Sequence, residues 1–205
     1  MNNEIIVLAG FSAAGKDTLA RVLSAVGYNF VVFHSTRPMR PEEETQGNPY
    51  NFIDDNQMLS MMANEELIEI REYQATQKKW FYALHKDAIK EDKKYVVVMD
   101  LEGAQKLRVK FGERVRIINV FSKNADRLKR AQQRKDFNME EWERRLSDDM
   151  TKYTQARISE LSDATLINND IISTSISLLR YIESINGKYQ EVLSYPKSEH
   201  SEAQK

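Results

Sequence analysis

The segment VLAGFSAAGKDT (residues 7–18) has residue types and a spacing that can hold a phosphate group. Four residues separate Gly10 from Gly15, and Lys16 follows directly, between an apolar run and a helical pattern. Glycines let the backbone curl so that consecutive N–H groups point at an anion, and a helix beginning near Lys16 adds its positive dipole end. A lysine there reaches the β- and γ-phosphates of a nucleotide. We therefore predict a nucleotide site rather than a plain glycine turn, formed by Gly10, Ser12, Ala13, Ala14, Gly15, Lys16, Asp17 and Thr18.

Asp17 stands where such loops usually carry the serine or threonine that ligates Mg²⁺. A carboxylate can also ligate Mg²⁺, directly or through water, so Asp17 is a candidate metal ligand. Thr18 offers a hydroxyl to a phosphate oxygen one residue later. The alternative is that Asp17 only stabilises the positive end of the helix dipole.

A second set of polar residues could hold a second phosphate. Arg37 and Arg40 lie three residues apart in a turn-rich segment, and Tyr50 follows. Each arginine can form a forked contact with phosphate oxygens, and the tyrosine can donate a further hydrogen bond. Asp100 ends an apolar run, and ligands of open α/β sheets bind at the carboxyl ends of strands, so its carboxylate would face metal or substrate. A solvated basic turn and a buried structural aspartate are the alternatives.

The elements that must position these residues alternate between strand and helix. Continuous apolar runs predict strands buried on both faces, as in parallel sheets, at residues 4–10, 30–35, 95–100 and 115–121, with a weaker one at 164–170. Helical patterns lie between them, at residues 16–26, 102–111, 123–135, 139–161 and 173–193. This alternation predicts an α/β fold with right-handed crossovers.

The composition limits the classes of function. The chain has 205 residues and a net charge of −1, which does not favour nucleic acid or an anionic membrane as a partner. It has no cysteine, which excludes disulfides and thiolate chemistry, and only three histidines, which disfavours a histidine-rich metal site. No apolar run approaches the ~20 residues of a membrane span, and the amino terminus does not resemble a signal peptide, so we expect a cytoplasmic protein.

Taken together, the motifs resemble those of the guanylate kinase family. They are, in chain order, the phosphate loop, Thr36-Arg37 with Arg40, Gly47 with Tyr50-Asn51-Phe52, Leu67-Ile68-Glu69, Asp100 with Gly103, Arg134 with Arg145, and Asn168-Asn169-Asp170. The resemblance implies the P-loop nucleoside monophosphate kinase fold, with a five-stranded, mostly parallel sheet and helices on both faces. It also implies a core of residues 1–35, 91–122 and 149–193, a nucleotide-binding insertion at 36–90 and a helical lid at 123–148. We expect residues 194–205 to form a disordered tail.

The resemblance also assigns roles. It implies transfer of a phosphoryl group from ATP, with Mg²⁺, to GMP or dGMP, by a monomer or a homodimer. Lys16, Arg134 and Arg145 would be catalytic, and Arg130 and Asn168 would join the phosphate loop in binding ATP. The expected substrate-binding residues are Ser35, Arg37, Arg40, Tyr50, Glu69, Tyr82 and Asp100, with Glu69 reading guanine. No general base is required, because the attacking phosphate, with a second pKa of about 6, is mostly dianionic at neutral pH.

The base pocket departs from the family pattern. Phe33 replaces a serine that contacts guanine, Leu84 replaces a serine or threonine, and Val98 stands where an aspartate is frequent. Ser35 or Thr36 could substitute for the lost hydroxyls. We therefore expect GMP or dGMP to be the best acceptor, with poorer apparent affinity than the family norm. Two alternatives remain: a kinase of the same fold that acts on another (deoxy)nucleotide or on a ribose bisphosphate, and a non-catalytic binding module.

Overall fold

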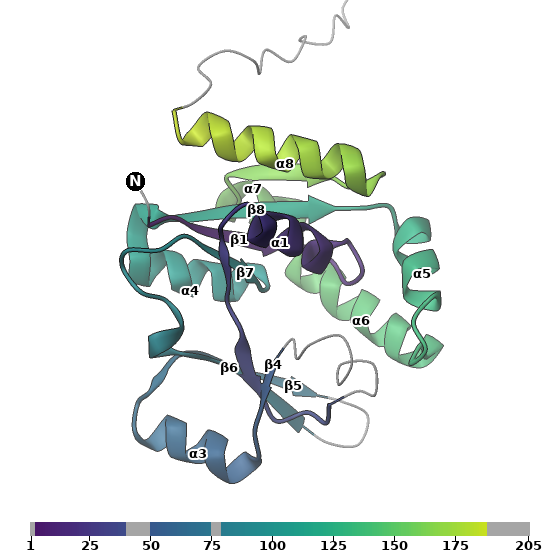
Figure 1. Ribbon diagram of the computed structural model, residues 1–205. Coiled ribbons are helices and arrows are strands. Elements are labelled where there is room, and N and C mark those ends of the chain that lie inside the picture. Colours follow the sequence, from purple (N-terminus) through teal and green to yellow (C-terminus); the bar gives the residue numbers. More distant parts are fainter. Residues whose placement is uncertain (1–2, 40–49, 75–78, 188–205) are drawn as a thin grey trace, which may run out of the picture.

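A computed structural model describes residues 3–39, 50–74 and 79–187 (Figure 1). Its core is a five-stranded sheet in the order β2-β7-β1-β8-β9, in which every strand pair is parallel. The strands are β1 (Ile5–Ala9), β2 (Asn29–Phe30), β7 (Tyr95–Val98), β8 (Val115–Phe121) and β9 (Ala164–Ile167). The predicted parallel five-stranded sheet is thus confirmed.

Helices cover both faces of this sheet, and β1 shows why its sequence is apolar throughout. Ile5 and Val7 face the cluster that contains residues of α4 (Leu101–Phe111) and α7 (Gln155–Leu161). Ile6 and Leu8 face the cluster that contains residues of α1 (Lys16–Ala25) and α8 (Ile171–Ile185). A strand buried on both faces must be apolar at every position rather than at alternate ones.

A smaller sheet lies below the core in Figure 1. It has the order β4-β3-β6-β5 and is formed by β3 (Phe33–Ser35), β4 (Tyr50–Phe52), β5 (Leu67–Gln74) and β6 (Lys79–His85). The helix α3 (Asp55–Ala63) accompanies it, and short 3₁₀ helices η1 (Lys86–Ala88) and η2 (Gly112–Arg114) connect other elements. The strand predicted over 30–35 is therefore two strands in two sheets, because an apolar run does not show which sheet buries it.

The remaining helices are α5 (Asn124–Gln132) and α6 (Met139–Lys152), on the right of Figure 1. The single helix predicted over 139–161 is wrong, since α6 ends at Lys152 and α7 begins at Gln155. The reason is local: Tyr153 is buried, and the hydroxyl of Thr154 accepts a hydrogen bond from the backbone N–H of Arg157, which caps a new helix. The helix predicted over 173–193 begins earlier, at Ile171, and ends earlier, at Ile185, where Asn186 forms its C-cap. Residues 188–193 lie outside the described part.

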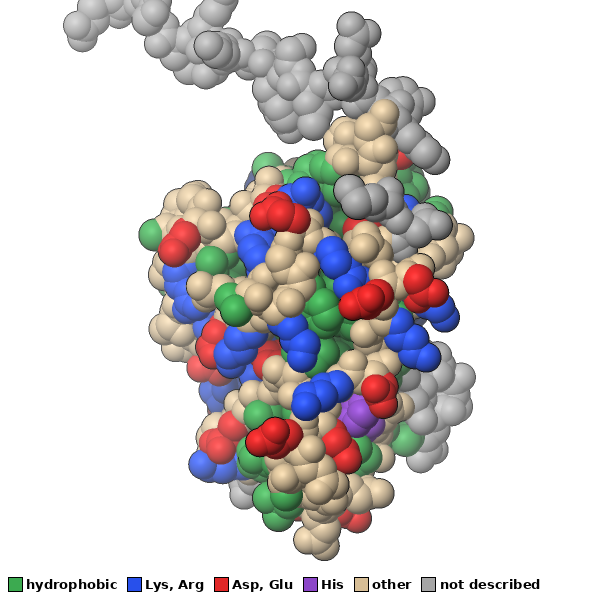
Figure 2. Space-filling model, turned by 90° about the vertical axis from the view of Figure 1, so that its left-hand side faces the viewer, with side chains coloured by type: hydrophobic (Ala, Val, Ile, Leu, Met, Phe, Trp, Pro, Cys, Tyr) green, Lys and Arg blue, Asp and Glu red, His purple; other side chains and the backbone are tan. Residues whose placement is uncertain are grey.

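The surface carries charges of both signs. On the face shown in Figure 2, Lys and Arg side chains lie among Asp and Glu side chains, in keeping with a net charge of −1. Within the described ranges, none of the helices has the length and apolar character needed to cross a membrane. The expected tail at 194–205 lies outside these ranges.

Candidate active site

The loop between β1 and α1 requires glycine at both ends. Gly10 has a φ of 141°, and an added Cβ atom would lie 2.3 Å from the carbonyl oxygen of Val120. Gly15 has a φ of 99°, and its Cβ atom would lie 2.3 Å from Nδ2 of Asn168. Any larger residue would therefore meet both backbone strain and a collision. The loop keeps its curled path because neighbouring strands and a distant asparagine leave room only for glycine.

Lys16 lies folded back across this loop. Its Nζ atom donates hydrogen bonds to the carbonyl oxygens of Gly10, at 2.7 Å, and Phe11, at 2.8 Å. Burial lowers the pKa of Lys16, and the charges of Asp17 and Asp149 act in the opposite direction. Asp17 and Thr18 are exposed on the first turn of α1. The ammonium group is thus held at the loop by carbonyls that a phosphate could replace as its partner.

Two side chains from other segments support the loop from behind. Asn168 donates from Nδ2 to the carbonyl oxygen of Ala14 at 2.7 Å. Arg130 on α5 donates to the carbonyl oxygen of Asn168 at 3.0 Å and to the hydroxyl of Ser122 at 3.1 Å. The charge of Arg130 is therefore directed at the loop, next to the place where donor phosphates would bind.

Arg127 joins α5, α6 and the loop. Its guanidinium lies between the rings of Phe11, 4.6 Å away, and Trp142, 5.6 Å away. It also donates to the carbonyl oxygen of Ser12 at 3.3 Å, and only 4% of the residue is exposed. Sequence reasoning missed this arginine, because its partners come from two distant segments, the loop and α6, and no local spacing marks it.

Asp149 on α6 also reaches the loop. Its Oδ2 atom accepts a hydrogen bond from the backbone N–H of Ser12 at 2.6 Å. A loop N–H group that would otherwise be available to a phosphate oxygen is thus occupied by a carboxylate. Asp149 too was missed from the sequence, since it lies 137 residues from Ser12.

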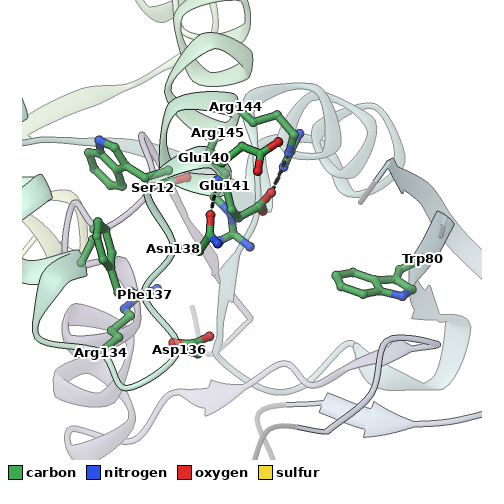
Figure 3. A pocket seen from close by; sticks show the side chains of 13 residues that line it. Ser12, Trp80, Arg134, Asp136, Phe137, Asn138, Glu140, Glu141, Arg144 and Arg145 are labelled. Carbon is green, nitrogen blue, oxygen red and sulfur yellow. Dashed lines mark hydrogen bonds and ion pairs between the residues drawn. The ribbon is translucent and has the colours of Figure 1, made fainter. Parts of the chain in front are cut away.

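A cavity of about 400 Å³ brings the loop together with α5, α6 and the segment between them. Ser12 and Ala13 line it together with Arg134 and Arg145. In Figure 3, Trp80 of β6 lies across the cavity from Arg134. Arg145 is held by Glu141, whose Oε1 atom accepts from its Nε atom at 2.6 Å. The two predicted lid arginines therefore border one space beside the phosphate loop.

A second cavity, of about 260 Å³, continues toward the smaller sheet. Lys16 and Arg145 line it, together with Tyr50, Tyr82 and Asp100. Arg145 and Ser12 line both cavities, so the two cavities lie side by side at these residues. This arrangement can place one phosphate at the loop and a second on the side of the smaller sheet.

Arg37 lies beside the second cavity and is 6% exposed. Its guanidinium carbon is 4.9 Å from the ring centre of Tyr50 and 5.0 Å from that of Phe52. The hydroxyl of Ser35 accepts from the backbone N–H of Arg37 at 3.3 Å, and that of Thr36 accepts from Phe81 at 3.0 Å. Both hydroxyls are thus engaged with backbone. The predicted residues Arg40 and Gly47 lie outside the described part of the chain.

The comparison with known families accords with this geometry. A family model for guanylate kinase matches residues 2–185, which is most of the chain. The chain belongs to the guanylate kinase family. It is 26% identical to the guanylate kinase of Helicobacter hepaticus over 195 residues, covering 92% of each chain. It is 29% identical to that of Trichodesmium erythraeum over 179 residues, covering 84% of this chain and 89% of the relative.

A solved structure shows the same fold. The guanylate kinase from Anaplasma phagocytophilum superposes with a TM-score of 0.63 at 22% identity, and the match covers 90% of this chain and 86% of that one. At this identity the likeness supports the fold of a guanylate kinase and does not extend to individual site residues.

In this member of the guanylate kinase family, the second cavity is lined by an arginine that sequence reasoning missed. Arg71 has its Nη1 atom 2.8 Å from Oδ2 of Asp100 and its Nε atom 3.2 Å from Oε1 of Glu69. Arg71 and Asp100 line the second cavity, whereas Glu69 lines neither cavity and its side chain is 1% exposed. The signal in the sequence was an arginine two residues after Glu69, on the same face of a strand.

The pKa values of the two carboxyl groups that contact Arg71 shift in opposite directions. Burial raises the pKa of Glu69, and the opposing charge of Arg71 does not reverse that shift. Burial acts the same way on Asp100, but Arg71 and the backbone N–H of Gly103 outweigh it and lower the pKa of Asp100. Arg71 therefore acts mainly as the partner of Asp100.

Proposed function

We propose that this chain transfers the γ-phosphoryl group of ATP to the phosphate of GMP or dGMP. The observation that carries the proposal is the position of Arg145, which borders both the cavity at the phosphate loop and the cavity at the smaller sheet. A kinase for two phosphorylated substrates needs cationic groups between the donor and acceptor phosphates, since both are anions. Membership of the guanylate kinase family supports the same conclusion.

The donor would bind at the loop. The β- and γ-phosphates of ATP would replace the carbonyls of Gly10 and Phe11 as partners of Lys16. They would also receive loop N–H groups, including that of Ser12 once Asp149 releases it. Arg130 and Asn168 would keep the loop in its curled conformation.

The acceptor would bind on the other side, with its phosphate near Arg37 and Tyr50. An oxygen of this phosphate attacks the γ-phosphorus, the bond from that phosphorus to the bridging oxygen breaks, and ADP leaves with its electron pair. Arg134 and Arg145 would stabilise the charge on the transferring group, where arginines act most strongly. Tyr73 of β5 donates to Oε1 of Glu141 at 2.6 Å, so the smaller sheet and α6 already meet beside this space.

We infer that Asp17, which is exposed on the first turn of α1, would be a protein ligand of Mg²⁺, directly or through water. Phosphates and waters supply most ligands of nucleotide-bound Mg²⁺, so one carboxylate is sufficient. Among the residues described, no group of three or more His, Cys, Asp or Glu residues could hold a metal ion, which agrees with a metal that arrives with the nucleotide. When bound, Mg²⁺ would neutralise charge on the β- and γ-phosphates.

The test is a coupled assay of ADP formation with ATP, Mg²⁺ and a panel of acceptors: GMP, dGMP, AMP, CMP, UMP and ribose 1,5-bisphosphate. GMP or dGMP should be turned over best. Lys16→Ala should lower turnover by roughly 10³-fold or more, because the point charge on the donor phosphates is lost. Turnover of a pyrimidine monophosphate or the ribose bisphosphate, with GMP inert, would overturn the choice of acceptor. Cytoplasmic location and a monomeric or homodimeric state stay predictions.

A further inference from the structure

We propose that Tyr73 is a positioning residue for phosphoryl transfer: its hydroxyl, acting through Glu141, holds the guanidinium of Arg145 at the two cavities. The inference rests on the proposed phosphotransfer function, in which Arg145 stabilises the charge on the transferring group. It adds that the position of this arginine on α6 depends on a contact from the smaller sheet.

Arg145 keeps most of its donors for a ligand. Its Nε atom donates to Oε1 of Glu141 at 2.6 Å, and its Nη1 and Nη2 atoms make no hydrogen bond to any residue that the structure describes. A guanidinium carries five N–H donors, and the contact with Glu141 uses one of them. Since Arg145 lines both cavities, its terminal nitrogens are the ones left for phosphate oxygens.

The ion pair with Glu141 does not by itself fix Arg145 in place. The two residues lie four positions apart on α6, and their side chains are 31% and 30% exposed. Exposed pairs at this spacing are weak, because two long side chains must be held in one geometry in contact with water. Arg144 binds the same carboxylate, with its Nε atom 2.8 Å from Oε2 of Glu141 (Figure 3). All three side chains belong to one helix, so their mutual contacts do not fix the carboxylate relative to the smaller sheet.

Tyr73 supplies a contact from outside the helix. It lies near the end of β5, and its hydroxyl donates to Oε1 of Glu141 at 2.6 Å, the same oxygen that accepts from Arg145. Its ring centre also lies 4.5 Å from the guanidinium carbon of Arg144 and 5.7 Å from that of Arg145. A hydrogen bond to a carboxylate is stronger than one between neutral groups, and a cation beside an aromatic ring adds to it. One side chain of the smaller sheet thus contacts every member of the cluster.

The smaller sheet determines where the hydroxyl of Tyr73 lies. Tyr73 pairs with Trp80 across β5 and β6, and their rings are 8° from parallel with centres 6.3 Å apart. Tyr82 meets the ring of Tyr73 edge-on, with centres 6.3 Å apart, and its own ring centre lies 5.3 Å from that of Tyr50. Tyr50, Tyr73 and Tyr82 all line the second cavity. The position of Tyr73 is therefore set on the proposed acceptor side, whereas the arginine that it holds would act on the transferring group.

Removal of the hydroxyl should change the rate more than the binding of substrates. A cationic group that stabilises the transferring phosphoryl acts in the transition state, and a displacement of about 1 Å can cost on the order of a hundredfold. Tyr73→Phe keeps the ring that lines the second cavity and removes only the contact with Glu141. It should lower kcat by roughly ten- to a hundredfold and change the KM for ATP and for GMP by less than about twofold.

Glu141→Leu tests the route of this effect, because it removes the carboxylate that Tyr73 and Arg145 share. Its kcat should fall at least as far as that of Tyr73→Phe. Adding Tyr73→Phe to it should then cost less than about twofold, since the hydroxyl has already lost its partner. Glu141→Gln, which keeps an oxygen acceptor, should retain more activity than Glu141→Leu. Steady-state kinetics with ATP, Mg²⁺ and GMP measure these four variants.

Nuclear magnetic resonance follows the position of Arg145 without turnover. The Nε–H signal of Arg145 in isotope-labelled protein without nucleotide is assigned by its loss in Arg145→Lys. In Tyr73→Phe it should shift or broaden, because Glu141 no longer has a fixed place. Tyr28→Phe is the matched control: Tyr28 also donates its hydroxyl to a glutamate, Glu4, and lines neither cavity, so both the signal and kcat should stay unchanged. Thermal unfolding of each variant checks that the fold is retained.

Three outcomes would overturn the inference. They are a kcat within about twofold of wild type in folded Tyr73→Phe, an unchanged Arg145 signal in that variant, and losses in Tyr73→Phe and Glu141→Leu that simply multiply in the double variant. If the signal changes as expected but the wild-type protein phosphorylates no acceptor, the positioning of Arg145 by Tyr73 stands and the proposed function fails.

Discussion

The Oδ2 atom of Asp149 lies 2.6 Å from the backbone nitrogen of Ser12, inside the loop proposed to hold the donor phosphates. The same carboxylate is close enough to Lys16 to act on its pKa. Asp149 thus occupies the N–H group of Ser12 and partly neutralises the positive charge of Lys16. ATP phosphates would use both groups, so we expect this side chain to move when ATP binds. The helix α6 carries both Asp149 and Arg145. A displacement of α6 would therefore couple the binding of ATP at the loop to the position of Arg145.

Asp149→Asn should therefore tighten ATP binding. The amide keeps the shape of the side chain but removes a negative charge beside the phosphates, and we expect about three- to tenfold tighter binding. Equilibrium titration with a non-hydrolysable ATP analogue measures the effect. Glu143→Gln, which removes the same charge from an exposed position on the same helix, should leave ATP affinity unchanged. Weaker ATP binding in Asp149→Asn would show that the carboxylate supports the loop rather than competing for it.

Gly15→Ala should damage both the fold and the loop. Gly15 and Gly27 share a φ of 99°, but a Cβ atom at Gly15 would lie 2.3 Å from Asn168, whereas at Gly27 nothing lies within 4 Å. Both variants should lose about 1–2 kcal/mol of unfolding free energy from backbone strain. Gly15→Ala should lose about 1–3 kcal/mol more, because Asn168 must release Ala14. Urea unfolding compares the two, and equal losses would contradict a specific collision at Gly15.

Arg37 and Arg134 should affect different kinetic constants. Arg37 lies near the acceptor side, so Arg37→Ala should raise the KM for GMP by roughly ten- to a hundredfold and spare the KM for ATP. Arg134 lines the cavity at the phosphate loop, and Arg134→Ala should lower kcat by roughly 10³-fold. Steady-state kinetics with each substrate varied in turn separates the two effects. A rise in the KM for ATP alone in Arg37→Ala would reverse the assignment of the two sites.

Asp100 should contribute stability that depends on pH. Its pKa in the folded protein lies below the ordinary value of 3.8, so ionised Asp100 stabilises the fold above that pH. The contribution is lost as pH falls through the lowered pKa. Asp100→Asn should therefore cost about 1.5–3 kcal/mol of unfolding free energy at pH 7, where the ion pair with Arg71 is broken. Measured at decreasing pH, this difference should shrink below about pH 4; a constant difference would contradict the linkage.

The phosphate loop, the parallel core sheet and the family could be predicted from the sequence, because each depends on local spacing. Gly10, Gly15 and Lys16 are separated by a fixed number of residues between one strand and one helix, so their order already specifies the backbone path. The continuous apolar runs of β1, β7 and β8 likewise reveal burial on both faces. The assignment of residues 30–35 to one strand failed, because the apolar run continues through the break between β2, which ends at Phe30, and β3, which begins at Phe33 in the other sheet.

Only the tertiary structure decided which charged side chains line the two cavities. Glu69 has the residue type and the place in the chain to read guanine, and the structure places its carboxylate beside Gly103 while Arg71 lines the cavity. Asp149 reaches Ser12 across 137 residues of chain, and Arg127 is held by two rings from separate segments. The interaction of a charge depends on distance and burial in space, and neither quantity is encoded in the spacing of residues along the chain.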